Sequence, residues 1–580
     1  MLGLLLWLIP ILSSGFILVL GFFEKRFVKP IAFLALLFCL ISSLKLLNVE
    51  MEATYPWIPV LGLNIGCLLD EWSTTFSFVI SLVGILILVY SFKYIKSGEV
   101  RYYSLFLLFI GSMLGFVLSG TLLQLFICWE LMGVCSYLLI GFHYSRTKAV
   151  NAGLKAILTT KIGDICLLLA ILLIFISTGS FDLSSLSHQL RFKEVISLFL
   201  IVAVLTKSAQ FPFYFWLVDA MEGPTTISAL LHSATMVASG VFLLLRFSFL
   251  ITPFGMLLLF VCSAISLLLG GTLALTNHDV KKILAFSTIS QLAFMLIAIY
   301  SGNYMAGFTH MINHAFFKSL LFLCIGIFIQ YVGSRELERM RFPLKYTPIL
   351  SFSFLSGISA LIGVPPFNGF WSKELIMSTK NLPVLSILLI GTFLTILYSF
   401  RLSFKIFSGK KKIRESFGLM QVSIMTLSLI CLISGFIEMK FIEIELDVLL
   451  PSLSIITVGF IISQLYFSEK IRWFHGHSLH ELLKNELYLN KFFERINTFL
   501  EKLSTFESFD RAISRSGFML SKSIYNILEL DLERIEEKTL NRFFKGIYRT
   551  LRHLQTSYLN YNILTLIVGI IILFILILVV

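Results

Sequence analysis

Three polar, titratable residues, His310, His314 and Lys318, lie four positions apart in the long apolar stretch 305–331. At a rise of about 1.5 Å per residue, this spacing puts them on one face of an α-helix over roughly 12 Å. A charged side chain at the centre of a bilayer costs about 2.5–3.5 kcal/mol even on lenient scales, so such residues are expected to be functional. The pattern predicts a path for protons or another cation.

The same stretch contains an HxxxH spacing, which is half of a helical zinc site. No glutamate follows the first histidine, and the charge of Lys318 on the same face disfavours a metal ion. We therefore expect a proton relay and no metal. In the preceding apolar stretch, Ser287, Ser290 and Gln291 could hold water beside it.

The composition is that of a polytopic membrane protein. Of the 580 residues, 57% are hydrophobic and only 14% are charged, more apolar side chain than a soluble protein could bury. None of the eight cysteines forms a CxxC pair, so neither a zinc knuckle nor an iron–sulfur signature is present. We expect no cofactor in this chain and assign any redox chemistry to other chains.

Apolar runs of about 20 residues predict about sixteen membrane spans and an all-α fold. The first is interpreted as a retained span and not as a signal peptide, because no small-residue cleavage site follows it. The predicted spans are 2–22, 30–48, 74–95, 102–121, 123–142, 153–177, 196–218, 226–249, 254–275, 281–301, 305–331, 346–378, 382–408, 419–437, 449–468 and 559–580.

Loop charge predicts the orientation. Loops after odd-numbered spans hold most of the lysines and arginines, as in Lys410, Lys411 and Lys412, whereas loops after even spans are poorer in cations. By the positive-inside rule the N-terminus faces outward. Residues 470–555 then lie on the cytoplasmic side, and this bias explains most of the net charge of +13 without nucleic acid.

Two spans carry internal breaks. Span seven contains Pro212 shortly after Lys207, and span twelve contains Pro365 and Pro366 shortly before Lys373. Proline removes a helical hydrogen bond, and a break at membrane depth survives only where it is buried in protein or lines a wet cavity. Both breaks share Pro-Phe followed by Phe-Trp. Interrupted helices in corresponding places are typical of transporters built from repeats.

We therefore divide the chain around two five-span units, spans 4–8 and 9–13, whose odd number of spans makes their topologies inverted. Residues 470–555 include an amphipathic pattern that predicts a lateral surface helix, with a solvated linker as the alternative. The predicted regions are 1–101 for spans one to three, 102–249 and 254–408 for the two repeats, 419–469 for spans fourteen and fifteen, 470–555 for the lateral helix and 559–580 for an anchor span.

Further titratable residues lie in spans five to seven. Glu130 is expected to pair with Lys207, since each could switch the other's protonation; a structural ion pair and a snorkelling lysine are the alternatives. Lys161 and Asp164 are three apart and can pair on one helix, either as a structural or gating pair or for direct proton transfer. Ser208 and Gln210 lie beside the predicted break.

In span eight, Ser228, His232, Thr235 and Ser239 are expected to share one helical face. A histidine there suits proton relay, and a satisfied core histidine is the alternative. Six titratable groups are expected to extend a polar axis along the membrane plane: Glu130, Lys207, His232, His310, Lys318 and Lys373.

Several segments resemble the antiporter-like subunits of respiratory complex I over roughly residues 55–410. They are the Trp-Glu-Leu-Met-Gly motif that begins at Trp129, the run Asp219 to His232, the run Ala285 to Gln291, and the run His310 to Lys318. The C-terminal amphipathic stretch and final span look like the largest, distal type, that of NuoL or NADH dehydrogenase subunit 5. The resemblance implies related five-helix halves, broken spans seven and twelve, and a lateral helix that braces neighbouring subunits.

The resemblance also implies roles for single residues. Glu130, Lys207, His232, Lys318 and Lys373 match the family's proton-transfer residues, with Lys373 as the outer exit. Lys161 stands where many members have arginine. The expected function is a proton-translocating subunit of a redox-driven pump without a redox centre of its own, in a prokaryotic plasma membrane or an equivalent energy-coupling membrane. The expected partners are antiporter-like and small membrane subunits, with iron–sulfur clusters in partner chains and flavin as a further candidate cofactor there.

Three alternatives remain open from the sequence: a subunit of a sodium/proton antiporter, a membrane subunit of an energy-converting hydrogenase-type complex, and a structural brace whose channel is idle. The electron donor, the electron acceptor and the coupling ion do not follow from these residues.

Overall fold

The computed structural model describes residues 1–58, 63–186, 190–409, 418–441 and 446–467. The chain divides into two compact units, residues 1–484 and 485–580, and every element described below belongs to the first. The predicted lateral segment 470–555 and the predicted anchor span 559–580 lie outside the described residues.

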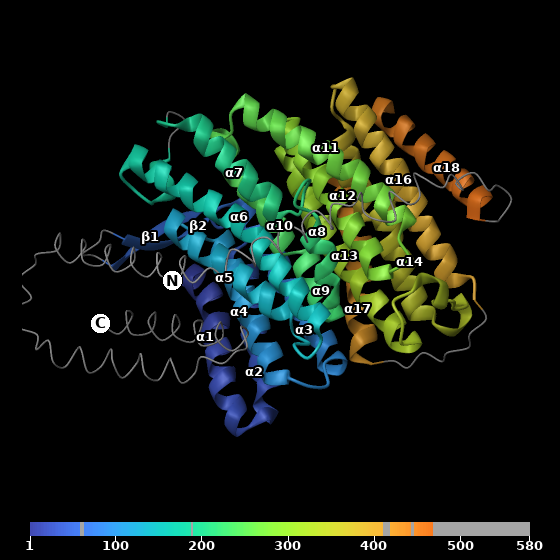
Figure 1. Ribbon diagram of the computed structural model, residues 1–580, viewed down its shortest axis with the longest axis horizontal. Coiled ribbons are helices and arrows are strands. Elements are labelled where there is room, and N and C mark those ends of the chain that lie inside the picture. Colours follow the sequence, from blue (N-terminus) through green and yellow to red (C-terminus); the bar gives the residue numbers. More distant parts are fainter. Residues whose placement is uncertain (59–62, 187–189, 410–417, 442–445, 468–580) are drawn as a thin grey trace, which may run out of the picture. The chain divides into compact units, whose positions relative to one another are not determined.

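Long helices make up nearly all of the described chain (Figure 1). Each predicted span up to residue 467 coincides with one helix or with an interrupted pair, which confirms the expected helical membrane fold. The continuous helices are α1 (Leu2–Phe23), α2 (Val28–Leu46), α3 (Glu71–Tyr94), α4 (Glu99–Val117), α5 (Leu122–Ile140), α6 (Thr147–Thr178), α11 (Pro253–Thr276), α12 (Val280–Tyr300), α13 (Tyr304–Val332), α16 (Leu382–Phe407), α17 (Leu419–Phe441) and α18 (Leu446–Phe467).

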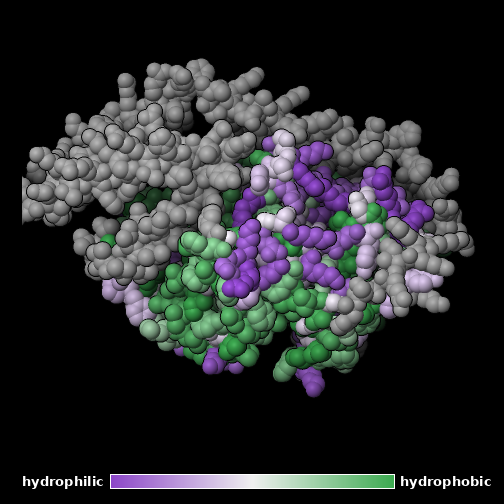
Figure 2. Space-filling model, turned by 90° about the horizontal axis from the view of Figure 1, so that it is seen from below, coloured by the Kyte–Doolittle hydropathy of each residue, from purple (hydrophilic) through white to green (hydrophobic). Residues whose placement is uncertain are grey.

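Twelve spans within the described residues are long and apolar enough to cross a membrane by length and composition. On the face shown in Figure 2, a broad hydrophobic area adjoins a group of hydrophilic residues, as expected of a surface that meets both lipid and water. The chain is therefore an integral membrane protein.

Three spans are interrupted pairs of helices. They are α7 (Lys193–Lys207) with α8 (Phe215–Asp219), α9 (Thr225–Ser233) with α10 (Met236–Phe247), and α14 (Pro348–Ile362) with α15 (Asn368–Met377). The first and third were predicted from their prolines. The second break, at Ala234 and Thr235, was not predicted, because neither proline nor glycine marks it.

The backbone groups freed at the first break find new partners. Trp216 Nε1 donates to Thr206 O at 3.0 Å, and the backbone N–H of Phe211 donates to Ser266 Oγ at 2.8 Å. A polar backbone group inside a membrane protein must be satisfied internally, so these bonds allow the break to persist at depth.

One element departs from an all-helical chain. Strands β1 (Met51–Ile58) and β2 (Leu63–Leu69) pair antiparallel between α2 and α3. Asp70 follows β2 and caps α3, where its side chain accepts from Ser73 N at 2.7 Å. This cap fixes where the hairpin ends and the third span begins.

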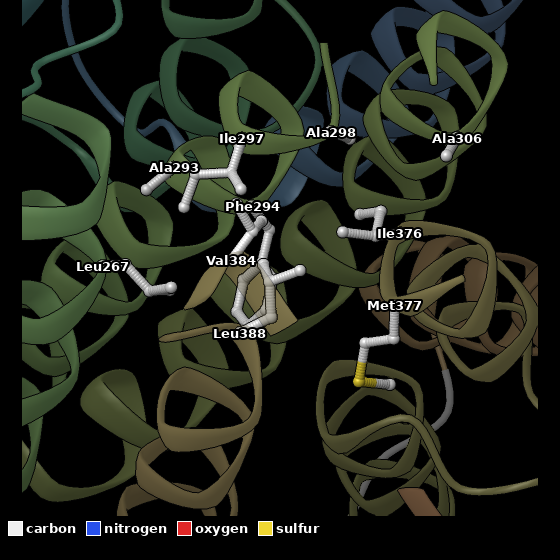
Figure 3. Packing of buried hydrophobic residues seen from close by; sticks show 10 residues of the cluster. All are labelled: Leu267, Ala293, Phe294, Ile297, Ala298, Ala306, Ile376, Met377, Val384 and Leu388. Carbon is white, nitrogen blue, oxygen red and sulfur yellow. The ribbon is translucent and has the colours of Figure 1, made fainter. Parts of the chain in front are cut away.

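A buried apolar cluster packs within the second half of the bundle (Figure 3). It joins side chains of α11, α12, α15 and α16, including Leu267, Phe294, Met377 and Leu388. Phe294 is at most 1% exposed, and its ring centroid lies 5.3 Å from Lys373 Nζ. The cluster therefore packs directly beside a buried lysine at the break between α14 and α15.

Candidate functional site

Lys207 is the last residue of α7 and is completely buried. Its ammonium donates to Asp164 Oδ1 at 3.2 Å and to Trp129 O at 3.3 Å. It also lies 4.4 Å from the centroid of the Trp129 ring, which is cation–π distance. The end of α7 thus places a cation among a carboxylate, a carbonyl and an aromatic face.

Asp164 of α6 is the carboxylate that holds this group together. Its Oδ1 also accepts from Trp129 Nε1 at 2.6 Å, and its Oδ2 lies 3.7 Å from Lys161 Nζ. Lys161 in turn bonds Glu130 of α5. The expected direct pairing of Glu130 with Lys207 is therefore wrong in detail, because each binds a member of the Lys161–Asp164 pair that α6 places between them.

The close approach of α6 and α7 makes this arrangement possible. Gly163 faces Thr206, and a Cβ at Gly163 would lie 1.8 Å from Thr206 Oγ1. The pair of Lys161 and Glu130 lies at the outer side of α6, where their side chains are 38% and 24% exposed. The site therefore begins at the surface of the chain and leads inward to Lys207.

His232 lies deeper and is completely buried on α9. Neither ring nitrogen has a hydrogen-bond partner among the described protein atoms. The ring lies between Trp216 and Phe322, at centroid distances of 6.5 Å and 6.1 Å. The alternative of a satisfied core histidine is thus not what the described residues show.

The other polar residues of span eight do not share a continuous face with His232. The helix ends at Ser233, so the expected face breaks before Thr235 and Ser239. Thr235 Oγ1 donates to Leu230 O at 2.6 Å, and Ser228 Oγ to Pro224 O at 3.4 Å. These hydroxyls satisfy local backbone, and the prediction of one polar stripe is wrong at the break.

The ladder predicted on α13 is present, and His310, His314 and Lys318 are all completely buried. Lys318 bonds Ser287 Oγ and donates to Leu284 O at 3.3 Å, both on α12. Its hydrogen-bond partners are thus neutral groups. Such a lysine can hold or release a proton without breaking a salt bridge.

The two histidines connect the continuous helix α13 to two of the interrupted spans. His314 Nδ1 lies 3.1 Å from Ser233 O, the last residue of α9, while its Nε2 has no partner among the described atoms. His310 Nε2 lies 3.1 Å from Gln291 Oε1, and its Nδ1 lies 2.9 Å from Ser372 Oγ of α15. Ser287 and Gln291 therefore contact the ladder directly.

Lys373 of α15 is 1% exposed, so it does not reach the surface of the chain as a snorkelling lysine would. Its ammonium donates to Leu361 O at 2.7 Å and to Ile362 O at 3.2 Å. These carbonyls are at the end of α14, where the helix leaves them without helical partners. A cation is favourable at this end of the helix dipole.

Ser208 and Gln210 line the first break. Ser208 Oγ donates to Val237 O at 3.0 Å, and Gln210 Nε2 donates to Ser208 O at 2.9 Å and to Ile289 O at 3.3 Å. They join the break in α7–α8 to α10 and α12, which lie on the way to the α13 ladder.

The titratable side chains thus fall into three sets: the group at Lys207, the single ring of His232, and the α13 ladder with Lys373. No direct hydrogen bond between described side chains joins one set to the next. No group of three histidine, cysteine, aspartate or glutamate residues within the described ranges could hold a metal ion. Proton transfer among these sets requires bridging water or side-chain motion.

Sequence reasoning missed the role of Trp129, which contacts both Lys207 and Asp164. It also missed three polar residues near the break between α14 and α15: Asn313, Asn368 and Glu438. Asn313 carried a usable signal, because it lies between His310 and His314 on an apolar span. Trp129 carried none, since a buried tryptophan is ordinarily part of a core.

Outside the spans, Glu222 and Arg335 form a two-bond ion pair at 2.8 and 3.0 Å. Burial alone raises the pKa of Glu222, but its hydrogen bonds to Arg335 and the charge of that residue more than offset this, so the pKa is lowered. Arg335 NH1 also donates to Met221 O at 3.1 Å, and Lys281 Nζ donates to Met221 O at 3.0 Å. These contacts fix the loop between α8 and α9.

Comparison with known protein families gives two matches. The family described as NADH:quinone oxidoreductase/Mrp antiporter, TM, matches residues 119–399. The family described as NADH-Ubiquinone oxidoreductase (complex I), chain 5 N-terminus, matches residues 57–106. Together the two matches cover more than half of the chain.

Curated relatives agree with these matches. The chloroplastic NAD(P)H-quinone oxidoreductase subunit 5 of Physcomitrium patens is 42% identical over 395 residues, which cover 63% of this chain and 55% of that protein. The NAD(P)H-quinone oxidoreductase chain 5 of Synechocystis is 40% identical over 374 residues, which cover 60% of this chain and 55% of that protein. The matched part thus spans little more than half the length of these relatives.

Two solved structures are similar in fold. A chain in the structure of the Mrp complex from Dietzia has a TM-score of 0.74 at 25% identity, covering 94% of this chain and 62% of that chain. A chain in the structure of the membrane-bound sulfane sulfur reductase, an archaeal respiratory membrane complex, has a TM-score of 0.70 at 23% identity, covering 80% and 99%. The second likeness concerns the fold alone.

Proposed function

This chain belongs to the family of NADH:quinone oxidoreductase and Mrp antiporter membrane subunits, and we propose that it translocates protons in a redox-driven membrane complex. The observation that carries the proposal is the set of titratable side chains buried inside the spans: Lys207, His232, His310, His314, Lys318 and Lys373 are each at most 1% exposed. Placing such groups in a membrane protein is costly, and they mark ion paths and proton relays.

The proposed path enters at Glu130 and Lys161, which are partly exposed, and passes through Asp164 to Lys207. The Lys207 ammonium is held by the Asp164 carboxylate, so a change in the charge of one partner changes the protonation of the other. Movement of Lys161 between Glu130 and Asp164 would gate this step, because Lys161 contacts both carboxylates.

From Lys207 the proton passes by way of His232 to the α13 ladder. Neither ring nitrogen of His232 is hydrogen-bonded within the described part of the chain, and imidazole can accept at one nitrogen and donate from the other. Lys318, His314 and His310 continue the path along α13, with Ser287 and Gln291 as hydrogen-bonding supports. Lys373 is the proposed outward exit.

The driving force comes from partner chains in this proposal. Moving one charge against the membrane potential requires roughly 2.3 kcal/mol per 100 mV. Electron transfer to quinone, as in the names of the relatives, would supply it. Iron–sulfur clusters, with flavin as a further candidate cofactor, would be held by partner chains. A partner membrane subunit would cover Lys161 and Glu130, since a charged pair is unfavourable against lipid.

The loop charges support a topology with the N-terminus outside and residues 470–555 on the cytoplasmic side, where a lateral helix would contact neighbouring subunits. We place the complex in a prokaryotic plasma membrane or an equivalent energy-coupling membrane.

The test is a Lys207→Ala variant in the intact complex, reconstituted into vesicles and driven by electron transfer to a short-chain quinone. NADH and reduced ferredoxin are each tried as the electron donor. We expect proton uptake per electron to fall while the assembled complex is retained. Glu336→Gln, in an exposed loop, is the control. Wild-type pumping by the Lys207 variant would refute the proposal and favour a structural brace.

A second candidate function is sodium/proton antiport, favoured by the match to the Mrp antiporter description and by the likeness to the Mrp complex. The same buried residues would then carry the exchanged proton. Vesicles given a pH gradient without an electron donor distinguish the two: sodium-dependent collapse of the gradient favours antiport, and no collapse favours the redox-driven pump.

A further inference from the structure

A second polar site lies beside the break between α14 and α15, on the side of α13 that faces α17. Asn313 of α13 is completely buried, and its Nδ2 donates to Asn368 O and to Glu438 Oε2, each at 3.0 Å. The Glu438 carboxylate, near the end of α17, is thus held against the α14–α15 break by the side-chain amide of Asn313, on the helix that carries the histidine ladder.

Helix α17 meets this break with its backbone. A Cβ at Gly435 would lie 2.0 Å from Pro366 O and 2.7 Å from Asn368 N. Only glycine permits so close an approach. Because Glu438 follows Gly435 by three residues, it lies on the same face of α17, one turn further along. The glycine therefore places the carboxylate at the break.

Several polar atoms in this site have no protein partner. Asn368 is completely buried, and neither its Oδ1 nor its Nδ2 has a hydrogen-bond partner among the described atoms; the same is true of Asn313 Oδ1. Leaving a buried donor or acceptor unsatisfied costs about 1–3 kcal/mol. Buried water is held where two to four such groups converge. Together with the Glu438 carboxylate, these amides provide enough partners to bind a water molecule.

Hydrogen bonds also lead from this site to the relay. His310 Nδ1 lies 2.9 Å from Ser372 Oγ, and Ser372 Oγ lies 3.4 Å from Asn368 O. Asn368 O is also the acceptor for Asn313, which binds Glu438. The ladder and the carboxylate are therefore linked through the Ser372 hydroxyl, the backbone carbonyl of Asn368 and the side-chain amide of Asn313.

We propose that Glu438 is a further proton-transfer residue, which gives the path a second outward branch beside Lys373. A protonated His310 gives up one proton through the Ser372 hydroxyl and a water bound by the two asparagines. His310 becomes neutral imidazole, and the Glu438 carboxylate becomes a carboxylic acid. It then releases the proton to the aqueous phase at the end of α17. This inference rests on the proposed proton-translocating function.

The test uses Glu438→Gln and Glu438→Asp in the intact, vesicle-reconstituted complex, with the donors and quinone named above. Glutamine can still accept from Asn313, so the packing is kept, but it cannot carry a proton. Removing a positioned proton-transfer group typically slows that step by about 100-fold or more. Because Lys373 remains as the other exit, we expect a partial loss of pumping in the glutamine variant. The aspartate variant, which keeps a carboxyl group, is expected to recover part of it.

Infrared difference spectra between high and low pH detect protonation of the Glu438 carboxylate directly. A purely structural role of Glu438 would give no such signal. The wild type should show the carbonyl stretch of a carboxylic acid that disappears in Glu438→Gln and persists in the control Glu336→Gln. Equal losses of pumping in the glutamine and aspartate variants, with no missing infrared band, would overturn the proposal. Wild-type pumping by Glu438→Gln while Lys207→Ala is inactive would overturn this inference alone. Wild-type pumping by both variants would overturn the proposed function as well.

Discussion

Replacing Asp164 with asparagine is expected to separate the electrostatic role of this residue from its shape. Asp164 is 1% exposed and lies 3.2 Å from Lys207, which is completely buried. Asparagine keeps an acceptor at Oδ1, so the bond from Trp129 Nε1 can persist. What the substitution removes is the negative charge that faces the Lys207 ammonium.

Removing one partner of a buried ion pair costs about 3–5 kcal/mol, because an uncompensated charge remains. That is about two to three and a half orders of magnitude in an equilibrium constant. Lys207 keeps two weaker supports, the Trp129 carbonyl and ring face, so we expect the lower end of this range. Without the Asp164 charge, the protonated form of Lys207 is strongly disfavoured and the side chain stays neutral. Proton transfer through Lys207 then stops.

The assay compares Asp164→Asn, Lys207→Met and the double variant in the reconstituted complex. Proton uptake per electron should fall below the wild-type value in all three. Resistance of the purified complex to heating should fall in Asp164→Asn and recover in the double variant, because a buried pair replaced by neutral groups of similar volume is often no less stable. Additive losses of stability, or full pumping by Asp164→Asn, would refute this reasoning.

Three other outcomes are expected. The lowered pKa of Glu222 means that its pairing with Arg335 stabilises the protein fully above the ordinary glutamate pKa, and that this stabilisation is lost as pH falls through the lowered pKa. In Glu222→Gln, acid unfolding followed by circular dichroism should therefore lack this pH-dependent part of the stability. An acid-unfolding profile equal to that of the wild type would contradict the prediction. Gly163→Ala should destabilise the chain by about 1–3 kcal/mol, since its Cβ would overlap Thr206 Oγ1; thermal unfolding of the purified complex measures this, and wild-type stability would show that α6 and α7 can separate freely. His232→Phe should keep the packing between aromatic rings yet lose pumping in vesicles; retained pumping would remove His232 from the path.

Much of the fold could be predicted from hydropathy and from proline. The apolar run lengths located the spans, and Pro212, Pro365 and Pro366 located two breaks, because proline cannot donate the helical hydrogen bond. The break at Thr235 could not be predicted in this way. Thr235 has φ −130° and ψ −103°. This conformation follows from tertiary packing, and no residue type near it in the sequence favours it. The predicted counterpart of that span, α16, is unbroken.

The sequence predicted which residues belong to the candidate site better than it predicted which of them contact one another. Charged residues and histidines inside apolar runs are easy to recognise as candidates, because burying them costs free energy. Their partners depend on how helices rotate and approach one another. Gly163 lets α6 come close to α7, so Asp164 reaches Lys207 while Lys161 reaches Glu130. Spacing along one helix contains no information about that cross-helix choice.

The most direct test of the central claim is the number of protons moved per electron by vesicles that carry Lys318→Met. Lys318 is completely buried and hydrogen-bonds only neutral groups, Ser287 Oγ and Leu284 O, among the described residues. Methionine keeps most of its volume and cannot carry a proton. With the complex assembled and electron transfer measured in the same vesicles, we expect a ratio below that of the wild type. A wild-type ratio would contradict proton transfer through the buried ladder.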